Sequence, residues 1–317
     1  MQALIDIILP VFGITLCGYA AGRAGLLGRE GVDALNRFVY YFALPALLFI
    51  LVAQAPRERL FYANFLYAWI GALVVTWAVT ALIGRYFYRD SLSIMSMRCI
   101  NVTFANCGYI GIPLAINAFG EDGALPAVLG VTILAVFVMS ATIFLIETDK
   151  SRGQSGQAAS TARILRQIAM ALLKNPITIP VAIGVLVPTF RIALPDVVVD
   201  FCRLLGGGAI PVTLFALGVF ISRQSLKHVG RQAGVMTFLT LAVHPFAAWV
   251  LIETLFPLEP VWAASTIMSA AMPAGATAFV IAQRYQVFVA ETSANILLST
   301  VLSVGSVSVL LLLLGAA

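Results

Sequence analysis

Two long apolar stretches of this chain, at residues 104–120 and 268–285, are each interrupted near their centre by glycine and proline. The interrupting residues are Gly108, Gly111, Pro113, Pro273 and Gly275. A helix broken inside hydrocarbon leaves backbone N–H and C=O groups without partners, so such breaks persist only where they are buried in protein or line a cavity. Two breaks at matching places in two halves of one chain are typical of a transporter's binding site.

The composition places both stretches in a membrane. Apolar residues make up 61% of the chain, charged residues only 10%, and the mean hydropathy is +0.99. A soluble domain carries about 25% charged residues. We therefore predict an all-α integral membrane protein with ten transmembrane helices, each near the length of about 20 residues that crosses a bilayer. The predicted spans are 3–22, 34–53, 62–84, 95–119, 125–146, 168–188, 198–221, 233–256, 261–284 and 290–314.

The positive charges predict how these spans are oriented. With the N-terminus outside, all but four of the nineteen lysines and arginines fall on the cytoplasmic side. The exceptions are Arg57, Arg59, Arg191 and Arg203. This positive-inside bias predicts a multi-pass protein of the cell's inner membrane with both termini on the non-cytoplasmic side. It also argues that the net charge of +5 does not reflect a nucleic-acid partner.

The second and seventh spans share a sequence pattern at an offset of 166 residues, in which Arg37 matches Arg203 and Pro45 matches Pro211. Chance in text rich in leucine and alanine supplies two or three such matches. A shared arginine and a shared proline in one register are harder to obtain by chance. The same register, within one residue, superposes the two interrupted stretches, which favours an internal repeat.

The repeat divides the chain into two halves. We predict a first repeat at residues 1–147, a cytoplasmic loop at 148–166 and a second repeat at 167–317. Because each half holds five spans, an odd number, the two repeats are predicted to be inverted relative to each other.

The interruptions predict an anion site. We expect the first broken span to end near Gly108 and to restart near Pro113, because proline lacks an N–H and favours the first position of a helix. In the second broken span, Pro273 and Gly275 act in the same way and Thr277 is free to cap the restarted helix. A restarted helix offers free N–H groups and about half a positive charge. Because no buried lysine or arginine is expected there, these dipoles would hold the anion. The alternative is that both interruptions are ordinary proline kinks.

The same two segments resemble motifs of the auxin efflux carrier family, which includes plant carriers and bacterial organic-acid permeases. They read Asn106-Cys-Gly-Tyr-Ile-Gly-Ile-Pro-Leu, ending in Phe119-Gly120, and Met272-Pro-Ala-Gly-Ala-Thr-Ala-Phe-Val-Ile-Ala-Gln-Arg-Tyr285. The resemblance implies ten spans, with the broken helices four and nine crossing. It further implies an elevator-type transport domain of spans three to five and eight to ten, moving against a scaffold of spans one, two, six and seven, in a homodimer.

The resemblance also implies roles for individual residues. Asn106 would donate its amide to the substrate, and Pro113 would mark the first crossover. Ala278 stands where the family often has a second crossover proline, so Pro273 could carry that break alone. The long cytoplasmic loop of the plant carriers is missing, which favours a bacterial-type member that carries malonate, malate or auxin-like acids across the lipid bilayer. The predicted substrate-binding residues are Asn106, Gly108, Gly111, Ile112, Pro113, Pro273, Ala274, Gly275, Ala276 and Thr277.

Two other functions remain open. A sodium-coupled organic-anion symporter of the bile-acid-transporter type shares this architecture but needs side-chain oxygens beside the breaks, of which this chain offers few. A membrane sensor or anchoring partner is disfavoured because the loops are short. The chain has no phosphate loop, no catalytic set and no metal-ligand spacing. We therefore predict no enzyme, cofactor or metal.

A few polar or small residues inside the spans carry further hypotheses. His244, just before Pro245, is either a neutral imidazole bonded to a backbone carbonyl or a proton-coupling group. Asn117, Asn295 and Ser299 could line the pathway. Gly18 and Gly22 form a GxxxG pattern that permits close helix packing, including a dimer contact. Asp200 and Arg203 are placed to pair on one helix face.

Overall fold

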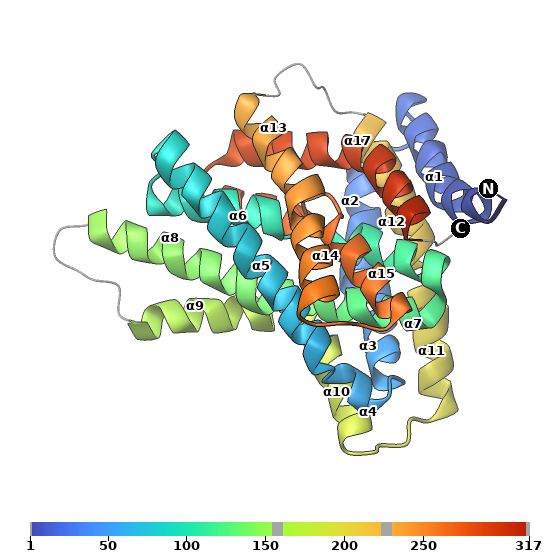
Figure 1. Cartoon of the computed structure of the whole chain (residues 1–317). Coiled ribbons are helices and arrows are strands. Elements are labelled where there is room, and N and C mark those ends of the chain that lie inside the picture. The colour runs from blue at the N-terminus through green and yellow to red at the C-terminus, as the bar shows by residue number, and fades with distance from the viewer. Residues whose placement is uncertain (1, 154–160, 223–229, 315–317) are drawn as a thin grey trace.

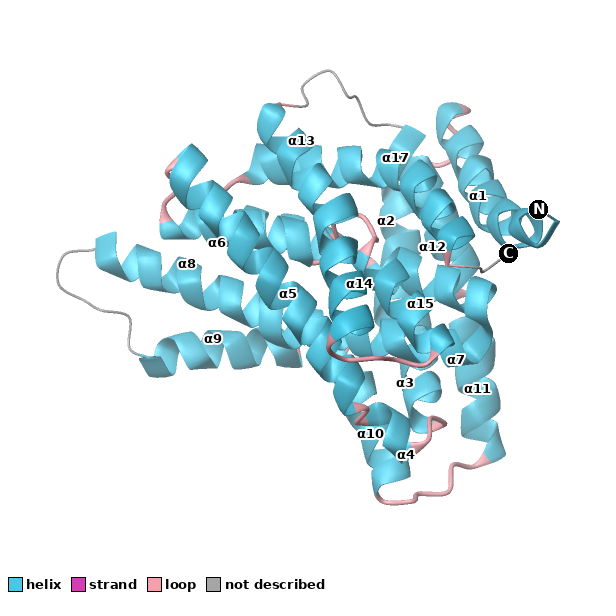
Figure 2. Ribbon diagram, viewed as in Figure 1, coloured by secondary structure: helices cyan, strands magenta, loops and turns pink. Residues whose placement is uncertain are grey.

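The computed structural model describes residues 2–153, 161–222 and 230–314, and every regular element in these ranges is a helix (Figure 1, Figure 2). The all-α prediction is therefore confirmed for the described chain. Part of the predicted loop at 148–166, residues 154–160, lies outside the described residues.

The elements of the first half are α1 (Gln2–Arg23), α2 (Arg29–Phe38), η1 (Val39–Ala43), α3 (Leu44–Ala53), α4 (Arg57–Leu60), α5 (Ala63–Ile83), η2 (Gly84–Tyr88), α6 (Leu92–Thr103), η3 (Cys107–Gly111), α7 (Ile112–Ile133), η4 (Leu134–Val138) and α8 (Met139–Gly153). Those of the second half are α9 (Thr161–Leu173), α10 (Thr178–Thr189), α11 (Asp196–Gly207), α12 (Ala209–Ser222), α13 (Arg231–Phe238), η6 (Leu239–Val243), α14 (His244–Thr254), α15 (Pro260–Ala270), α16 (Ala276–Tyr285) and α17 (Val289–Leu313).

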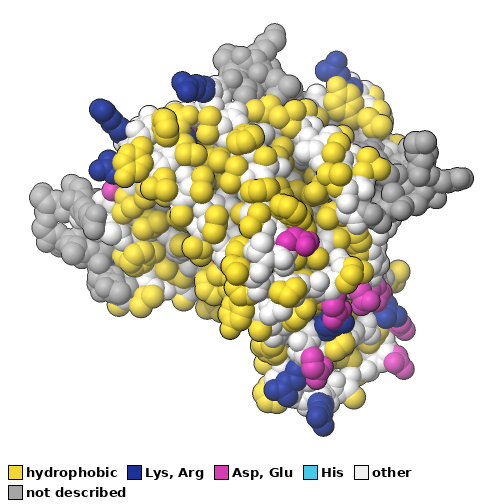
Figure 3. Space-filling view, in the orientation of Figure 1, with side chains coloured by type: hydrophobic (Ala, Val, Ile, Leu, Met, Phe, Trp, Pro, Cys, Tyr) yellow, Lys and Arg dark blue, Asp and Glu magenta, His cyan; other side chains and the backbone are white. Residues whose placement is uncertain are grey.

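The helices are those of a multi-pass membrane protein. Among the described residues, six continuous helical segments are long and apolar enough to cross a bilayer, and a seventh is added if the bent pair α9–α10 counts as one span. The face seen in Figure 3 is mostly hydrophobic between a lower end with acidic and basic side chains and an upper end where Lys and Arg stand out. The count of ten spans stays a prediction.

The sixth predicted span, 168–188, is not one straight helix. It consists of α9 and α10, whose axes are bent by 75°. Pro176 explains the bend, because proline has no N–H to donate and disfavours helical backbone at the preceding residue, Asn175. The side chain of Asn175 stabilises the turn, since its Oδ1 accepts a hydrogen bond of 3.0 Å from the N–H of Ile177.

Three intramembrane prolines follow wide π-helical turns. Pro45 follows η1, Pro113 follows η3 and Pro245 follows η6, each two residues after the turn ends. A proline ring clashes with the carbonyl group one turn earlier in an α-helix. A single π turn moves that carbonyl out of the way and lets the helix continue. The chain therefore passes these prolines without ending the helix.

The helices pack as two groups joined at α7, η3 and α9. One group contains α1, α3, α10, α11 and α12; the other contains α5, α6, α8 and α13 to α17. Contacts of α7 with α1 and α3, of η3 with α12, and of α9 with both α8 and α10 join the groups. In Figure 1, α1 and α12 lie to the right, and α3 and α10 lie at the lower end.

A buried ion pair holds the second group together beyond the end of α5. Arg98 on α6 is fully buried, and its Nε donates to Asp90 Oδ2 at 2.7 Å. Its Nη2 donates to Gln232 of α13 at 2.9 Å. The rings of Tyr88 and Phe288 lie 4.1 and 5.0 Å from the guanidinium carbon. One side chain thereby links η2, α6, α13 and the residue before α17.

The GxxxG pattern of α1 packs inside the chain. A Cβ atom added to Gly18 would overlap the backbone of Phe215 on α12, and one added to Gly22 would overlap Ser222. The facing residue Gly218 is equally close to the backbone of Thr15. Because α12 fills this face of α1, the pattern explains close helix packing within one chain and not a dimer contact.

We predict that replacing Gly18 or Gly218 by alanine destabilises the protein by about 1–3 kcal/mol, because the added methyl forces α1 and α12 apart. The melting temperature of the purified protein in detergent measures this loss. Gly13→Ala on the same helix is the matched control, because nothing lies within 4 Å of its Cβ position. Equal melting temperatures for all three variants and the parent protein would contradict the packing.

Candidate functional site

The two interrupted stretches cross and pair through their backbones. Helix α6 ends at Thr103 and α15 ends at Ala270, and neither chain is helical again until Cys107 and Ala276. Between these ends, Ala105 and Ala274 form an isolated antiparallel bridge. The N–H of Asn106 donates to the carbonyl of Pro273 at 2.7 Å, and the N–H of Gly275 donates to the carbonyl of Phe104 at 2.7 Å. Each break thus provides hydrogen-bond partners for backbone groups that the other break leaves unpaired.

The first break lies upstream of its predicted position. We expected it between Gly108 and Pro113, but the non-helical residues are Phe104 to Asn106. Gly108 and Gly111 lie within the π turn η3, and Pro113 is accommodated at the start of α7. The prediction of a restart at Pro113 was wrong because the π turn lets helical backbone begin several residues before the proline.

The second break matches the predicted region, but its cap differs. Gly275 precedes the first residue of α16 with extended backbone, and no side chain caps the helix. Thr277 is the second helical residue, so its predicted capping role was wrong. A Cβ atom on Gly275 would lie 3.0 Å from the Phe104 carbonyl oxygen, so any larger residue here forces the crossing chain to shift.

Two helix starts therefore face the crossover with uncommitted donors. The N–H groups of Gly108 and Tyr109 in η3, and of Ala276 and Thr277 in α16, make no backbone hydrogen bond in the described chain. The half-buried Asn106 side chain also has no hydrogen bond to another described residue. Such helix starts carry partial positive charge, so the crossover favours a negative group.

The remaining predicted site residues form the walls of the crossover. Gly108, Gly111, Ile112, Pro113, Pro273 and Ala274 are all buried, whereas Ala276 is exposed and Thr277 is half-buried. Gly111 faces the Met272 side chain, whose Cγ lies 3.3 Å from the glycine's Cβ position. The structure thus brings the two predicted segments together through residues 105–111 and 272–275.

A buried polar network supports the breaks. Ser299 accepts a hydrogen bond of 3.1 Å from the N–H of Ala274. Asn295 donates to the carbonyl of Asn101, near the end of α6, at 3.0 Å. Asn295 and Ser299 were predicted to line the pathway, but their contacts show that they fix the backbone of the breaks.

Further members of this network were not predicted. Asn101 donates to Thr292 at 2.8 Å, and Thr237 donates to Asn295 at 2.9 Å. Thr292, Asn295 and Ser299 recur at helical spacing on α17, which is the sequence signal that could have identified the network. Asn117 has an interaction of its own and is not free.

A cavity of about 320 Å³ reaches the start of α16. Thr277, Val280, Ile281 and Arg284 line it from α16, and Lys174 and Asn175 line it from the bend between α9 and α10. The prediction had assigned both cations to the cytoplasmic side of the membrane and missed that they share a cavity with Thr277. They meet only through the α9–α10 bend, which the sequence did not predict.

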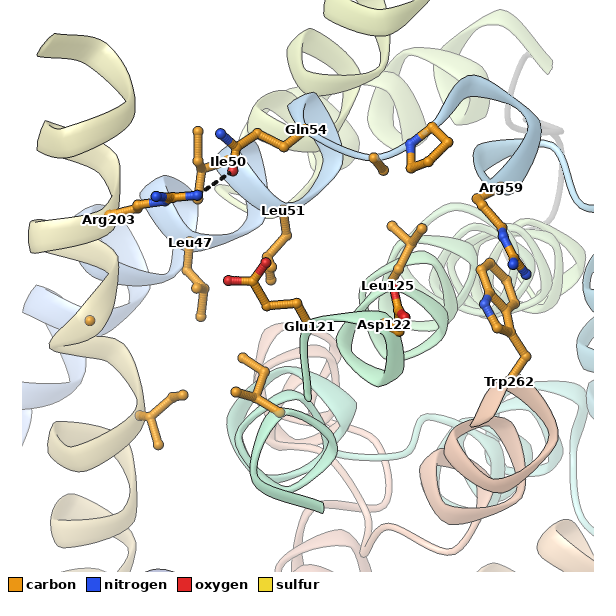
Figure 4. A pocket seen from close by; sticks show the side chains of 15 residues that line it. Leu47, Ile50, Leu51, Gln54, Arg59, Glu121, Asp122, Leu125, Arg203 and Trp262 are labelled. Atoms are coloured by element: carbon orange, nitrogen blue, oxygen red, sulfur yellow. Dashed lines mark hydrogen bonds between the residues drawn. The ribbon is translucent and has the colours of Figure 1, made fainter. Parts of the chain in front are cut away.

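A second cavity, of about 450 Å³, opens at the other end of the broken segment (Figure 4). Trp262 at the start of α15 lines it, together with α3, α7 and α12. Its charged lining is mixed, with Arg59, Arg203, Glu121 and Asp122. Arg203 donates to Gln54 at 3.1 Å, and no ion pair with Asp200 is formed in the described structure. None of the predicted substrate-binding residues lines this cavity.

Comparison with known proteins identifies the family of this chain. A model of the family described as "Membrane transport protein" matches residues 3–311. The chain belongs to this membrane transport protein family. The predicted resemblance to the auxin efflux carriers is confirmed, and the protein is a membrane transporter.

Three similar proteins match most of the chain. A "Putative malonate transporter" of Rhizobium meliloti is 29% identical over 99% of this chain and 97% of its own length. An "Uncharacterized transporter" of Escherichia coli is 22% identical over 92% of this chain and 91% of its own length. "Auxin efflux carrier component 5" of Arabidopsis thaliana is 21% identical over 89% of this chain and 88% of its own length.

His244 of this transporter lies buried at the start of α14, with its ring centroid 5.8 Å from that of Trp69. The carbonyl of Ala270, at the end of α15, acts on the imidazole electrostatically, but neither ring nitrogen makes a hydrogen bond of acceptable geometry. The predicted bond to a carbonyl freed by Pro245 is not formed. The imidazole is therefore a buried group close to the second break, with the carbonyl of Ala270 as its backbone neighbour.

We predict that Gly275→Val disrupts the crossover, because its side chain must displace the Phe104 carbonyl and the hydrogen bond that this carbonyl accepts. The expected loss is about 1–3 kcal/mol, read as a lower melting temperature in detergent. Gly108→Ala is the control, since its methyl would meet neighbours only at ordinary contact distances of 3.7–3.9 Å. Equal melting temperatures for the two variants would contradict the role of the bridge.

Proposed function

We propose that this membrane transporter carries small organic anions, with the substrate's carboxylate held at the crossover of the two broken stretches. The observation that supports this most directly is the pair of helix starts whose free N–H groups flank one backbone bridge, beside the unpaired amide of Asn106. Preorganised N–H groups at helix starts bind anions without requiring a buried cation. The name of the Rhizobium meliloti relative is consistent with malonate as one such anion, and malate and auxin-like acids have the same carboxylate chemistry.

We propose that transport proceeds by alternating access. The two cavities support this, because they lie at opposite ends of the broken segment formed by α15 and α16. An elevator-type movement is supported by the packing of α1, α3, α10, α11 and α12 as one group and of α5, α6, α8 and α13 to α17 as another. In terms of the predicted spans, the first group corresponds to the scaffold and the second to the transport domain.

The order of elements supports the two inverted repeats of five spans. In each half, a short helix (α6 or α15) is followed by a non-helical break and a restarted helix, and then by the last long helix of that half. Ten spans, an inner-membrane location with both termini on the non-cytoplasmic side, and a homodimer complete the proposal. In Figure 3, Lys and Arg predominate at the upper end and are mixed with Asp and Glu at the lower end, which supports this orientation.

We predict that Asn106→Ala raises the KM for carboxylate uptake about tenfold or more, because one hydrogen bond to a charged group is lost. Asn106→Asp should abolish uptake, since it places a negative charge where the anion binds. Uptake of radiolabelled malonate into proteoliposomes measures both effects, with Asn36→Ala, at an exposed site on α2, as the control. Unchanged uptake kinetics in Asn106→Ala would contradict the site.

The alternative function, sodium-coupled symport, has one supporting observation. Buried oxygens without hydrogen-bond partners, including Asn101 Oδ1, Thr266 Oγ1 and Ser269 Oγ, lie on the two helices that end at the crossover. Helix C-terminal ends carry partial negative charge and favour cations. These oxygens are neutral, and no aspartate or glutamate is among the buried polar residues of the described chain.

We predict that replacing sodium by choline leaves malonate uptake unchanged, because no carboxylate is available at the crossover to bind the ion. A fall in uptake would favour the symporter.

The same proteoliposomes test whether His244 couples protons to transport. If it does, His244→Gln should remove the dependence of uptake on a pH gradient while malonate exchange at equal pH continues. A response to the gradient equal to that of the parent protein would leave the imidazole a packing role.

A further inference from the structure

The cavity at the α9–α10 bend has a one-sided charge. Of the residues that line it, Lys174 and Arg284 are cationic and none is acidic. The ion pairs of the described chain are Arg59–Glu259 and Arg98–Asp90, so neither cavity cation is neutralised by one. The other cavity differs, because two carboxylates accompany its two arginines.

Neighbouring side chains leave these cations available to a ligand. The Arg284 guanidinium carbon lies 5.5 Å from the centre of the Tyr285 ring, and the Lys150 ammonium lies 4.9 Å from the same centre. The nearby carboxylate of Glu147 interacts with the Tyr285 hydroxyl group and does not line the cavity. Lys174 follows the last residue of α9, where the chain turns, and its backbone is fixed by a hydrogen bond of 3.0 Å from its N–H to Met170.

Asn175 adds a neutral donor that has no partner of its own. Its side chain is only 7% exposed, and its Oδ1 is already used to accept from the N–H of Ile177. That bond fixes the orientation of the amide, so Nδ2 remains as a donor without a hydrogen bond to another described residue, on a residue that lines the cavity. An amide donor and two cations around one cavity are the chemistry that recognises a carboxylate.

We infer that Lys174, Asn175 and Arg284 bind a second carboxylate of the substrate, so that the transporter selects short dicarboxylates over monocarboxylates. This inference rests on the proposed function, in which the crossover holds the first carboxylate. Thr277 connects the two places, because it belongs to the first turn of α16 and also lines the cavity. A monocarboxylate bound at the crossover leaves both cations without a partner and gains nothing from them.

The test compares malonate with its monomethyl ester, which has nearly the same shape and one charge fewer. Each is added as a competitor of radiolabelled malonate uptake into proteoliposomes, and each is also titrated against the melting temperature of the purified protein, since a ligand of the folded state raises it. We expect the parent protein to prefer malonate about tenfold or more, the effect of one charge-assisted hydrogen bond.

The double variant Lys174→Gln, Arg284→Gln should bind the ester as before and malonate about tenfold more weakly, so that the preference disappears. Lys174→Arg, which keeps the charge, should retain it. Arg85→Gln removes a charge at an exposed site that does not line the cavity and is the matched control.

The outcomes separate the two proposals. Equal affinity of the parent protein for malonate and the ester, or an unchanged preference in the double variant, would overturn the selectivity inference and leave carboxylate transport standing. Failure of the parent protein to bind or transport malonate, its ester, malate and an auxin-like acid would overturn the proposed function itself, and the selectivity inference with it.

Discussion

The backbone bridge between Ala105 and Ala274 is the contact on which the site depends. A chain that leaves its helix at membrane depth exposes N–H and C=O groups, each of which costs several kcal/mol if unpaired in hydrocarbon. Here, two hydrogen bonds of 2.7 Å pair the two breaks with each other. Because these bonds use the groups on one side of each break, the N–H groups of Gly108, Tyr109, Ala276 and Thr277 stay free. The stability of the crossover and the anion affinity that we propose for it therefore have one origin.

The class and family of this protein could be predicted from its sequence because they depend on average properties and on short motifs. Low charge content indicated a membrane protein, and the two Gly- and Pro-containing segments indicated the family. The two segments that pair through the Ala105–Ala274 bridge both lie in the interrupted stretches singled out in the sequence. These features are local in the chain, so no knowledge of distant contacts was needed to find them.

The errors arose where backbone geometry depends on neighbours. Gly108 and Pro113 indicated a break between them, but a π turn accommodates this proline, and the chain breaks at residues 104–106 instead. The hydrogen bond of Asn295 to the carbonyl of Asn101 was not predicted, because this partner is 194 positions away in the sequence. The α9–α10 bend was missed for a related reason: Pro176 indicates a kink, but only the fold shows that the kink directs Lys174 and Asn175 into a cavity shared with α16.

The buried Arg98 has a mechanical consequence. Its guanidinium cannot leave Asp90 without placing an uncompensated charge in the protein interior, which costs about 3–5 kcal/mol. Segments η2, α6 and α13 are therefore constrained to move together. Under the alternating access that we propose, movement would instead fall on the contacts between the two groups, which are those of α7 with α1 and α3, of η3 with α12, and of α9 with α8 and α10.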